Sequence, residues 1–316
     1  MAKTLVLGAN GFIGSHLVDS LVDAGHTVRA FDRFSSDKYM FNNSENIEVI
    51  AGDYLNLNDL DQALNDVEYV FHFISTTTPA SAENDPVVDV DTNIRMSVEL
   101  FKLCVSKKIG KVIFASTGGA VYGNNDKLTS FKETDTPYPV SPYAIGKLTI
   151  EHYLRYFRVK HGLGSLVLRI SNPYGERQPF HRKQGVIPIF LENIYQDKPI
   201  TVLGDGSMTR DYIYVKDLAN GIVSMFQQDT IEDTYNMGAG VATSVNQLIE
   251  VAREVSQKEI LIEHKEVPPT FLQKVDLDTS SFNREFGRLA VTSLNDGMAR
   301  TYDYIRREIG KTENEE

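Results

Sequence analysis

Short apolar runs alternate with longer amphipathic segments through the first half of the chain. The runs with the length and composition of strands are Leu5–Leu7, Val28–Asp32, Ile47–Ala51, Tyr69–Phe73, Val112–Ser116 and Leu166–Ile170. The segments Val87–Val105 and Tyr143–Lys160 instead place apolar residues at helical spacing. Strands that alternate with helices in this way predict an α/β fold with a doubly wound parallel sheet, covered on both faces.

The regular alternation fades after residue 172. The second half is expected to contain short strands at Ile200–Leu203 and Tyr212–Val215 and helices at Ile187–Tyr195 and Val245–Val255. We predict that residues 1–172 form the domain with the large sheet. Residues 173–209 and 236–316 would form a smaller C-terminal α/β domain that binds substrate, and the segment 210–235 would return to the first domain.

Three glycines follow the first apolar run: Gly8, Gly11 and Gly14. Between a strand and a helix they allow a tight turn, close approach of the backbone to a pyrophosphate, and close packing of the helix on the sheet. Phe12 and Ile13 would begin that helix, whose N-terminus offers free N–H groups to a phosphate. Asp32 ends the next strand, where a carboxylate binds both hydroxyls of an adenosine ribose. The pattern predicts a Rossmann-type site for NAD, although Arg33 could hold the additional phosphate of NADP.

The composition narrows the possible functions. A net charge of −11 argues against binding to nucleic acids or anionic membranes, which attract basic surfaces. Cys104 is the only cysteine and the histidines show no metal-ligand spacing, so we expect neither a disulfide framework nor a metal site. No apolar run approaches membrane-spanning length and the first strand begins almost at once, so we expect a cytoplasmic protein.

Tyr143 and Lys147 lie four residues apart at the start of a predicted helix, on one face of it. A lysine ammonium beside a phenol favours the phenolate and lowers a pKa that starts near ~10. Such a tyrosine can act as a base near neutral pH. The pair gains weight from its position, because it follows a strand that ends at Ser116 and Thr117 in a chain that opens with a dinucleotide site.

With these residues the chain resembles the extended short-chain dehydrogenase/reductases, in particular the nucleotide-sugar epimerases typified by UDP-glucose 4-epimerase. The resemblance runs from about Lys3 to about Leu294. The matching motifs, in chain order, are Gly8-Ala-Asn-Gly-Phe-Ile-Gly14, Gly52-Asp53, His72-Phe-Ile-Ser75, Asn93, Ser116-Thr117-Gly-Gly-Ala-Val-Tyr-Gly123, Ser141-Pro-Tyr143-Ala-Ile-Gly-Lys147, Arg169-Ile-Ser-Asn172-Pro-Tyr-Gly175 and Gly204-Asp-Gly-Ser-Met-Thr-Arg210.

The resemblance implies a role for each matching residue. Tyr143 would remove the proton from a sugar hydroxyl while NAD takes hydride from the same carbon, and Lys147 would bind the nicotinamide ribose. Thr117, or as a second choice Ser116, would hydrogen-bond the reacting oxygen. Asn172 and Arg210 would hold the diphosphate of the substrate. The cofactor contacts implied besides Lys147 are Gly8, Gly11, Phe12, Ile13, Gly14, Asp32, Asp53, Tyr54, Phe73, Ser75 and Asn93.

The implied reaction is NAD-dependent epimerisation at C4 of a nucleotide sugar, either a UDP-hexose or a UDP-N-acetylhexosamine, through a transient 4-keto intermediate. Alternatives on the same fold are a 4,6-dehydratase and a 4-keto reductase. Dehydrating relatives place Asp-Glu just after the active-site threonine, where this chain has Gly118-Gly119. A non-catalytic dinucleotide sensor is a third alternative, against which the intact Tyr143 and Lys147 argue. Val275 falls near a tyrosine that excludes N-acetyl sugars in some relatives, so an acetamido group would have room here.

Several of these residues keep a structural alternative. His72 could be a hydrogen-bonded core residue, Asp53 a turn former, and Arg210 a cap for the turn at Gly204–Gly206. The polar run Thr76-Thr-Thr-Pro79 could contact sugar hydroxyls or form a turn through its own hydroxyls.

Members of the family usually dimerise through a bundle of four helices, so the resemblance implies a homodimer that binds a small-molecule nucleotide sugar. The helices would be about Val87–Lys107 and Tyr143–Lys160. Their apolar residues, which would form the bundle or face the sheet, are Leu100, Phe101, Cys104, Leu154 and Phe157.

Overall fold

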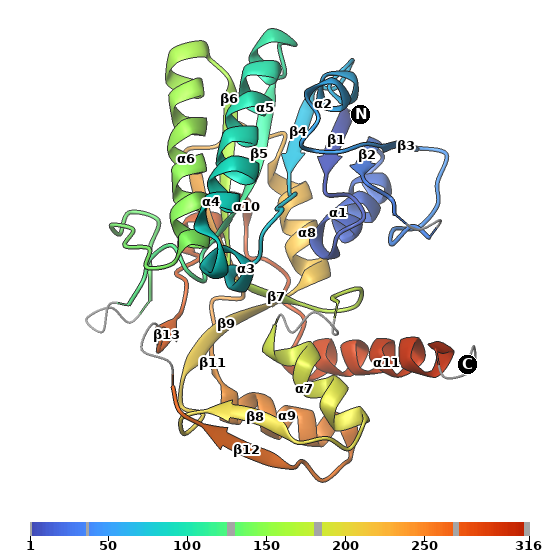
Figure 1. Cartoon of the computed structure of the whole chain (residues 1–316), viewed down its shortest axis with the longest axis vertical. Coiled ribbons are helices and arrows are strands. Elements are labelled where there is room, and N and C mark those ends of the chain that lie inside the picture. The colour runs from blue at the N-terminus through green and yellow to red at the C-terminus, as the bar shows by residue number, and fades with distance from the viewer. Residues whose placement is uncertain (1, 36–37, 125–129, 180–184, 268–271, 313–316) are drawn as a thin grey trace.

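A sheet of seven parallel strands forms the centre of the molecule, in the order β10-β6-β5-β4-β1-β2-β3 (Figure 1). The structure is a computed structural model that describes residues 2–35, 38–124, 130–179, 185–267 and 272–312. The strands are β1 (Lys3–Leu7), β2 (Thr27–Asp32), β3 (Ile47–Ala51), β4 (Tyr69–His72), β5 (Lys111–Thr117), β6 (Gly164–Ile170) and β10 (Thr234–Met237). The predicted doubly wound parallel sheet is confirmed.

Helices cover both faces of this sheet (Figure 1). The helices on one face are α2 (Leu57–Ala63), α5 (Arg95–Ser106) and α6 (Pro142–His161). Those on the other face are α1 (Phe12–Asp23), α8 (Val215–Met225) and α10 (Ser280–Phe286). Each face has its own apolar core, because the buried strands present side chains to both sides.

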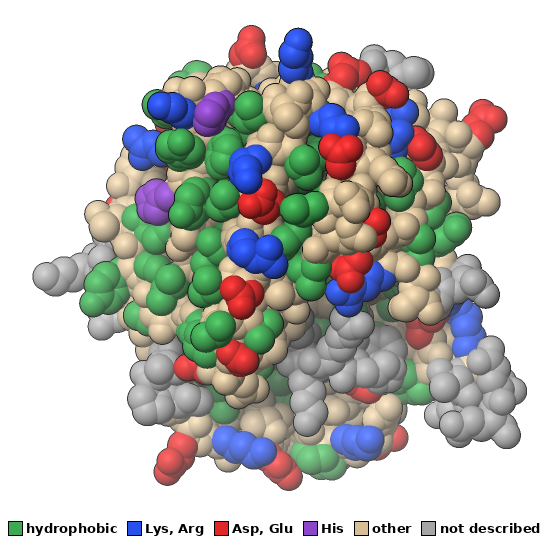
Figure 2. All heavy atoms as spheres, turned by 45° about the horizontal axis from the view of Figure 1, so that its top comes forward, with side chains coloured by type: hydrophobic (Ala, Val, Ile, Leu, Met, Phe, Trp, Pro, Cys, Tyr) green, Lys and Arg blue, Asp and Glu red, His purple; other side chains and the backbone are tan. Residues whose placement is uncertain are grey.

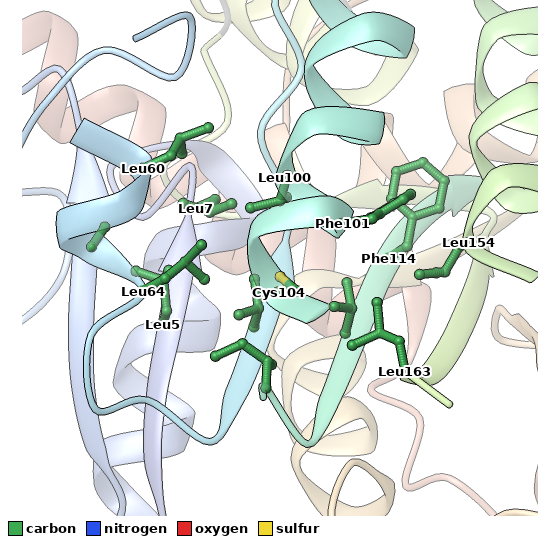
Figure 3. Close-up of a cluster of buried hydrophobic side chains, with 14 of the residues drawn as sticks. Leu5, Leu7, Leu60, Leu64, Leu100, Phe101, Cys104, Phe114, Leu154 and Leu163 are labelled. Carbon is green, nitrogen blue, oxygen red and sulfur yellow. The ribbon is translucent and has the colours of Figure 1, made fainter. Parts of the chain in front are cut away.

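The residues considered for a helix bundle face the sheet instead. Leu100, Phe101 and Cys104 of α5 are fully buried, and Leu154 of α6 packs in the same cluster against Phe114 of β5. Figure 3 shows these side chains pointing from the helices toward the strands. A bundle of these helices between two copies of the chain would therefore have to use the opposite sides of α5 and α6.

The helix expected over Val87–Val105 is present and continuous, but it contains a π turn. The chain forms α3 (Pro79–Asn84), α4 (Pro86–Asp89), a π turn at Val90–Ile94 and then α5. A π turn contains one more residue than a turn of α-helix, and this distortion is frequent at functional sites. Its Asn93 points into a polar network that is described below.

A second group of elements packs beneath the sheet in Figure 1. Its strands are β7 (Asn172–Tyr174), β8 (Ile200–Leu203), β9 (Thr209–Tyr214), β11 (Ala242–Ser244), β12 (Ile262–Lys265) and β13 (Lys274–Val275). Its helices are α7 (Val186–Tyr195), α9 (Val245–Ser256) and α11 (Leu294–Thr312), which share one apolar core. Within the described ranges, no helix is long and apolar enough to cross a membrane.

The chain returns to the large sheet late in the sequence. After β9, helix α8 packs on α1, and β10 pairs with β6 along its whole length, from Thr234 to Met237. A later segment also reaches the end of β5, because a Cβ at Gly118 would lie 2.5 Å from the side chain of Leu277. The division into two domains stays a prediction, and β10 extends the return beyond residue 235.

Candidate active site

The loop between β1 and α1 requires glycine. Gly8 has a φ of 86°, and a Cβ there would lie 3.0 Å from the backbone nitrogen of Ile74. A Cβ at Gly14 would lie 2.0 Å from the carbonyl oxygen of Gly8, so the helix can approach the loop only without a side chain. Gly11 is the N-cap of α1 and no side chain caps this end. Backbone N–H groups of the first turn, at Phe12 and Ile13, are therefore left for a ligand.

Asp32 ends β2 beside this loop. One of its carboxylate oxygens accepts the backbone N–H of Asn10 (2.9 Å) and the other accepts that of Arg33 (2.8 Å). A carboxylate can accept about four hydrogen bonds, so each oxygen keeps capacity for a ribose hydroxyl. The glycine loop, the uncapped helix and Asp32 together fit the pyrophosphate and the adenosine ribose of NAD.

Arg33 is directed toward Asp53. Its Nη2 lies 3.2 Å from Oδ1 of Asp53, and both side chains are exposed. Asp53 also accepts the backbone N–H of Leu55 (2.9 Å), which forms a local turn. This hydrogen bond and Arg33 hold the pKa of Asp53 below its usual value. The cation that could favour NADP is thus paired with an acid, and Asp53 has a turn-forming role.

The side chains after β4, and that of Tyr54, are bound to the protein itself. Phe73 is partly buried against the core, and Ser75 donates to the carbonyl of Thr77 (2.9 Å). Tyr54 is buried, with its hydroxyl 3.2 Å from Ser97 Oγ and 3.3 Å from Nε2 of His72. The cofactor contact predicted for Tyr54 is therefore limited to its backbone, because its side chain fills the core.

His72 takes its structural alternative. Its Nε2 lies 2.8 Å from Ser97 Oγ. Burial, followed by the nearby Lys147, lowers the pKa of His72 to about 3. The ring is therefore neutral at physiological pH and lines the same cavity as Tyr143 and Lys147.

Tyr143 and Lys147 lie on the first turns of α6, which begins after Ser141 and Pro142. The buried Nζ of Lys147 donates to the carbonyl of Ala115 on β5 (2.9 Å). The same atom lies 4.9 Å from the ring centroid of Phe114 and 5.8 Å from that of Tyr143. The predicted pair is thus assembled at the C-terminal edge of β5, where ligands bind in sheets of this kind.

The protein groups alone do not lower the pKa of Tyr143. Burial first, and then the negative charge of Asp89, raise the pKa of this phenol to about 12. Burial lowers the pKa of Lys147 to about 8, although Asp89 and Glu151 act in the opposite direction. The ionisation of Tyr143 beside Lys147 therefore stays a prediction, and it depends on the added positive charge of the nicotinamide.

Asn93 has a supporting role. Its amide nitrogen donates to Asp89 Oδ1 (2.8 Å) and to Thr77 Oγ1 (2.9 Å). Its oxygen accepts the backbone N–H of Thr76 (3.0 Å) and the Thr76 hydroxyl (3.1 Å). These four hydrogen bonds use the whole capacity of the amide, so the predicted cofactor contact of Asn93 can be made only through its backbone.

The threonine run forms a turn, as its structural alternative states. Thr77 Oγ1 donates to Asp89 Oδ1 (2.5 Å), and Thr78 caps α3 in a reciprocal pair with Ser81. Thr76 contacts Thr92 and Asn93. The three hydroxyls are therefore bound to protein groups.

Ser116 and Thr117 point to different partners. Ser116 donates to Glu151, which forms a buried ion pair with Arg169 (2.8 Å). Thr117 instead ends β5 beside Asn172, since a Cβ at Gly119 would lie 3.8 Å from Thr117 Oγ1 and 3.7 Å from Asn172 Oδ1. This arrangement favours Thr117 over Ser116 as the hydroxyl that meets a substrate.

The predicted diphosphate residues occupy neighbouring strands. Asn172 donates to the carbonyl of Asp211 (2.9 Å). Arg210 of β9 donates to the carbonyls of Thr209 (2.7 Å) and Leu272. These contacts do not include the turn at 204–206. Val275 is buried and lies opposite Arg210 in the register of β13 and β9.

Sequence reasoning missed Asp89 and Glu151. Asp89 reads as one polar position of a helix, and Glu151 as a polar residue one turn beyond Lys147. The spacing of Tyr143, Lys147 and Glu151 along one helix face was the available signal for Glu151. For Asp89 the only signal was Gly146, a glycine inside a predicted helix that calls for a packing reason.

Comparisons with known proteins agree with this geometry. Residues 4–238 match a family model described as the NAD dependent epimerase/dehydratase family. The chain is 32% identical over 308 residues to a dTDP-4-dehydro-6-deoxyglucose reductase from Escherichia coli, covering 96% of this chain and 97% of the relative. It is 32% identical over 313 residues to a UDP-glucose 4-epimerase from Mycolicibacterium smegmatis, covering 96% and 98%.

A solved structure gives the same picture. The UDP-glucose 4-epimerase of Thermotoga maritima with UDP-glucose superposes with a TM-score of 0.89 at 34% identity, covering 97% of this chain and 99% of that one.

Proposed function

The chain belongs to the NAD dependent epimerase/dehydratase family, and from that premise we propose that it interconverts C4 epimers of a UDP-sugar with NAD as its cofactor. The predicted family and cofactor are confirmed by the family match. The observation that carries the reaction is the Tyr143–Lys147 pair beside Thr117, with Gly118 and Gly119 where dehydrating relatives carry acids.

The residues of the site would divide the chemistry as follows. Tyr143 takes the proton of the C4 hydroxyl and later returns it, while Lys147 binds the nicotinamide ribose and adds positive charge beside the phenol. Thr117 hydrogen-bonds the reacting oxygen. Bound NAD would supply the acceptor and the donor for the hydride of C4. Asn172 and Arg210 hold the diphosphate, so the 4-keto sugar can turn and present its other face.

A second candidate is a 4-keto reductase. It is favoured by the identity to the E. coli reductase named above. An epimerase needs no added reductant, whereas a reductase consumes NADH or NADPH with each keto sugar. Incubation with a panel of UDP-, dTDP- and GDP-sugars, with the products followed by NMR, distinguishes the two.

Replacing Tyr143 by Phe tests the catalytic role. We expect kcat to fall by about 10²–10⁴-fold, because the base is removed, while NAD remains bound. The matched control is Tyr156→Phe, which changes an exposed tyrosine of the same helix and should leave kcat unchanged. A Tyr143→Phe enzyme with full activity would exclude the mechanism.

We also propose a homodimer that acts in the cytoplasm. The outer sides of α4 and α6 expose Val87, Ile145, Tyr156 and Val159, which are 49–81% accessible. Figure 2 shows hydrophobic side chains gathered in the left half of the view, on the side where α5 and α6 lie in Figure 1. A patch of this kind marks an interaction site. Sedimentation of the wild type and of Val159→Glu checks the dimer, and only the wild type should sediment as a pair.

A further inference from the structure

A buried carboxylate lies behind the catalytic pair. Asp89, the last residue of α4, is 4% exposed. Its Oδ1 accepts hydrogen bonds from Thr77 Oγ1 (2.5 Å) and Asn93 Nδ2 (2.8 Å). Both donors are neutral, so they orient the carboxylate without cancelling its charge.

The other oxygen of Asp89 rests on the backbone of α6. A Cβ at Gly146 would lie 2.1 Å from Oδ2 of Asp89, which is well inside contact distance. Gly146 precedes Lys147 and follows Tyr143 by three residues, so it lies between the two catalytic positions along the helix. The absence of a side chain at 146 is therefore what admits a carboxylate next to both groups.

These groups line one small cavity. The cavity measures about 10 Å³ and its polar walls include His72, Asp89, Asn93, Tyr143 and Lys147. That volume approaches what a single water occupies. In so small a space, lined mostly by buried groups, the charge of a carboxylate acts strongly on its neighbours.

The other charged groups around the pair are compensated or neutral. From α6, Glu151 faces Lys147 but is bound to Arg169 of β6 at 2.8 Å. From β4, His72 is neutral because burial lowers its pKa to about 3. From α5, Ser97 faces the cavity and carries no charge. Asp89 is thus the carboxylate at the cavity that has no arginine partner among the described residues.

We propose that Asp89 is a positioning residue that sets the pH range of catalysis, because its charge keeps Lys147 cationic and restrains the ionisation of Tyr143. The phenol then becomes a base only when further positive charge, such as that of an oxidised nicotinamide, enters the site. Asp89 acts in the same direction on both groups, since its charge raises the pKa of Tyr143 and opposes the lowering of the pKa of Lys147 by burial. This inference rests on the proposed function.

The test neutralises the carboxylate and keeps its shape. In NAD-loaded Asp89→Asn, the ionisation midpoint of Tyr143 should fall by about one pH unit, the size of the effect of one nearby charge. The midpoint is read from phenolate absorbance as the difference from the same protein carrying Tyr143→Phe. The acid limb of the kcat profile should move to lower pH by the same amount.

The matched control is Asp85→Asn. Asp85 caps the same short helix through Val87 N and Val88 N, is exposed, and would keep its cap as asparagine. This variant should leave the midpoint of Tyr143 and the acid limb unchanged. An unchanged midpoint in folded Asp89→Asn would overturn the inference, as would an equal shift in Asp85→Asn.

A second variant covers the case in which Asp89→Asn does not fold. Gly146→Ala places a methyl group where Oδ2 now lies, so the carboxylate must move away and the midpoint should fall in the same direction. The absorbance titration needs no substrate. A shifted midpoint without turnover of any UDP-sugar would therefore reject the proposed function alone, whereas turnover with a fixed midpoint would reject the role of Asp89.

Discussion

Two buried carboxylates flank Lys147, and they are held in different ways. Glu151 forms an ion pair with Arg169 in which both side chains are 7% exposed, and it also accepts a hydrogen bond from Ser116. Asp89 is held by the neutral Thr77 and Asn93 and rests on Gly146. The difference shows that burial alone does not define the role of an acidic residue. Glu151 links α6 to β5 and β6 through Ser116 and Arg169. The charge of Asp89 is not neutralised by a basic partner in the described part of the chain, so it acts on Tyr143 and Lys147.

The largest effect on the free energy of unfolding is expected from breaking the ion pair between Glu151 and Arg169. Arg169→Met would leave Glu151 buried without a counter-charge, at a cost of about 3–5 kcal/mol in the free energy of unfolding. Urea denaturation measures this loss. The double variant Arg169→Met with Glu151→Met should recover most of it, and Asp89→Asn should cost far less than Arg169→Met. A mild Arg169→Met would mean that the pair is not what joins these elements.

The next largest effect is expected from low pH, which should reduce the free energy of unfolding through His72 at the cavity. The pKa of His72 is lowered to about 3, so its stabilising contribution is complete above the unfolded value near ~6.5 and is lost as the pH falls toward 3. Between pH 7 and 5 this one group should remove about 2 kcal/mol of stability. In His72→Gln, which keeps a donor for Ser97, the dependence of the unfolding free energy on pH should be shallower. Equal slopes in both proteins would contradict this assignment.

Gly146→Ala should cost about 1–3 kcal/mol, because the new methyl group overpacks against Asp89. In an Asp89→Ala background the same change should be neutral or stabilising, since alanine is the better helix former. Gly310→Ala, in a helix with open space around its Cα, is the control that should not destabilise. Thermal denaturation of the four proteins and the control checks the coupling. If Gly146→Ala is equally destabilising in the Asp89→Ala background, the methyl group clashes with a group other than Asp89.

The smallest effect belongs to Ser116. Removing its hydroxyl in Ser116→Ala deletes one hydrogen bond to Glu151 and should cost about 1 kcal/mol of stability. Because the hydroxyl points to Glu151, kcat should change by less than a few-fold. A loss of activity comparable to that of Tyr143→Phe would restore Ser116 as the substrate hydroxyl.

The local features of this molecule could be predicted from its sequence. The strand Ile47–Ala51 and helix α7 follow directly from apolar runs, and the glycine loop and Tyr143–Lys147 carry short-range signals. The π turn could not be predicted, because Val87–Val105 has unbroken helical spacing and the turn depends on tertiary contacts of Asn93. Strand β10 and helix α11 were also missed, since short or strongly polar segments give weak patterns.

The same distinction applies to the site. The position of Asp89 is set by the packing of α4 against Gly146, so no spacing along the chain could reveal it. The ambiguity between Ser116 and Thr117 was likewise one of side-chain direction. Partners that are distant in sequence decide it: Ser116 binds Glu151, whereas Thr117 lies beside Asn172.

Leu277 lies against Gly118, the residue that follows β5. The end of this strand therefore depends on residues from the C-terminal part of the sequence. Phe131 binds the same late stretch, with its N–H on the carbonyl of Asp276 and its carbonyl accepting from Asp278 at 2.8 Å each. A polypeptide shortened to residues 4–238, the portion that matches the family model, would lack these contacts. We therefore do not expect it to retain an intact dinucleotide-binding domain. It would expose the loop that follows Thr117, so most of the chain must be synthesised before this side of the site is covered.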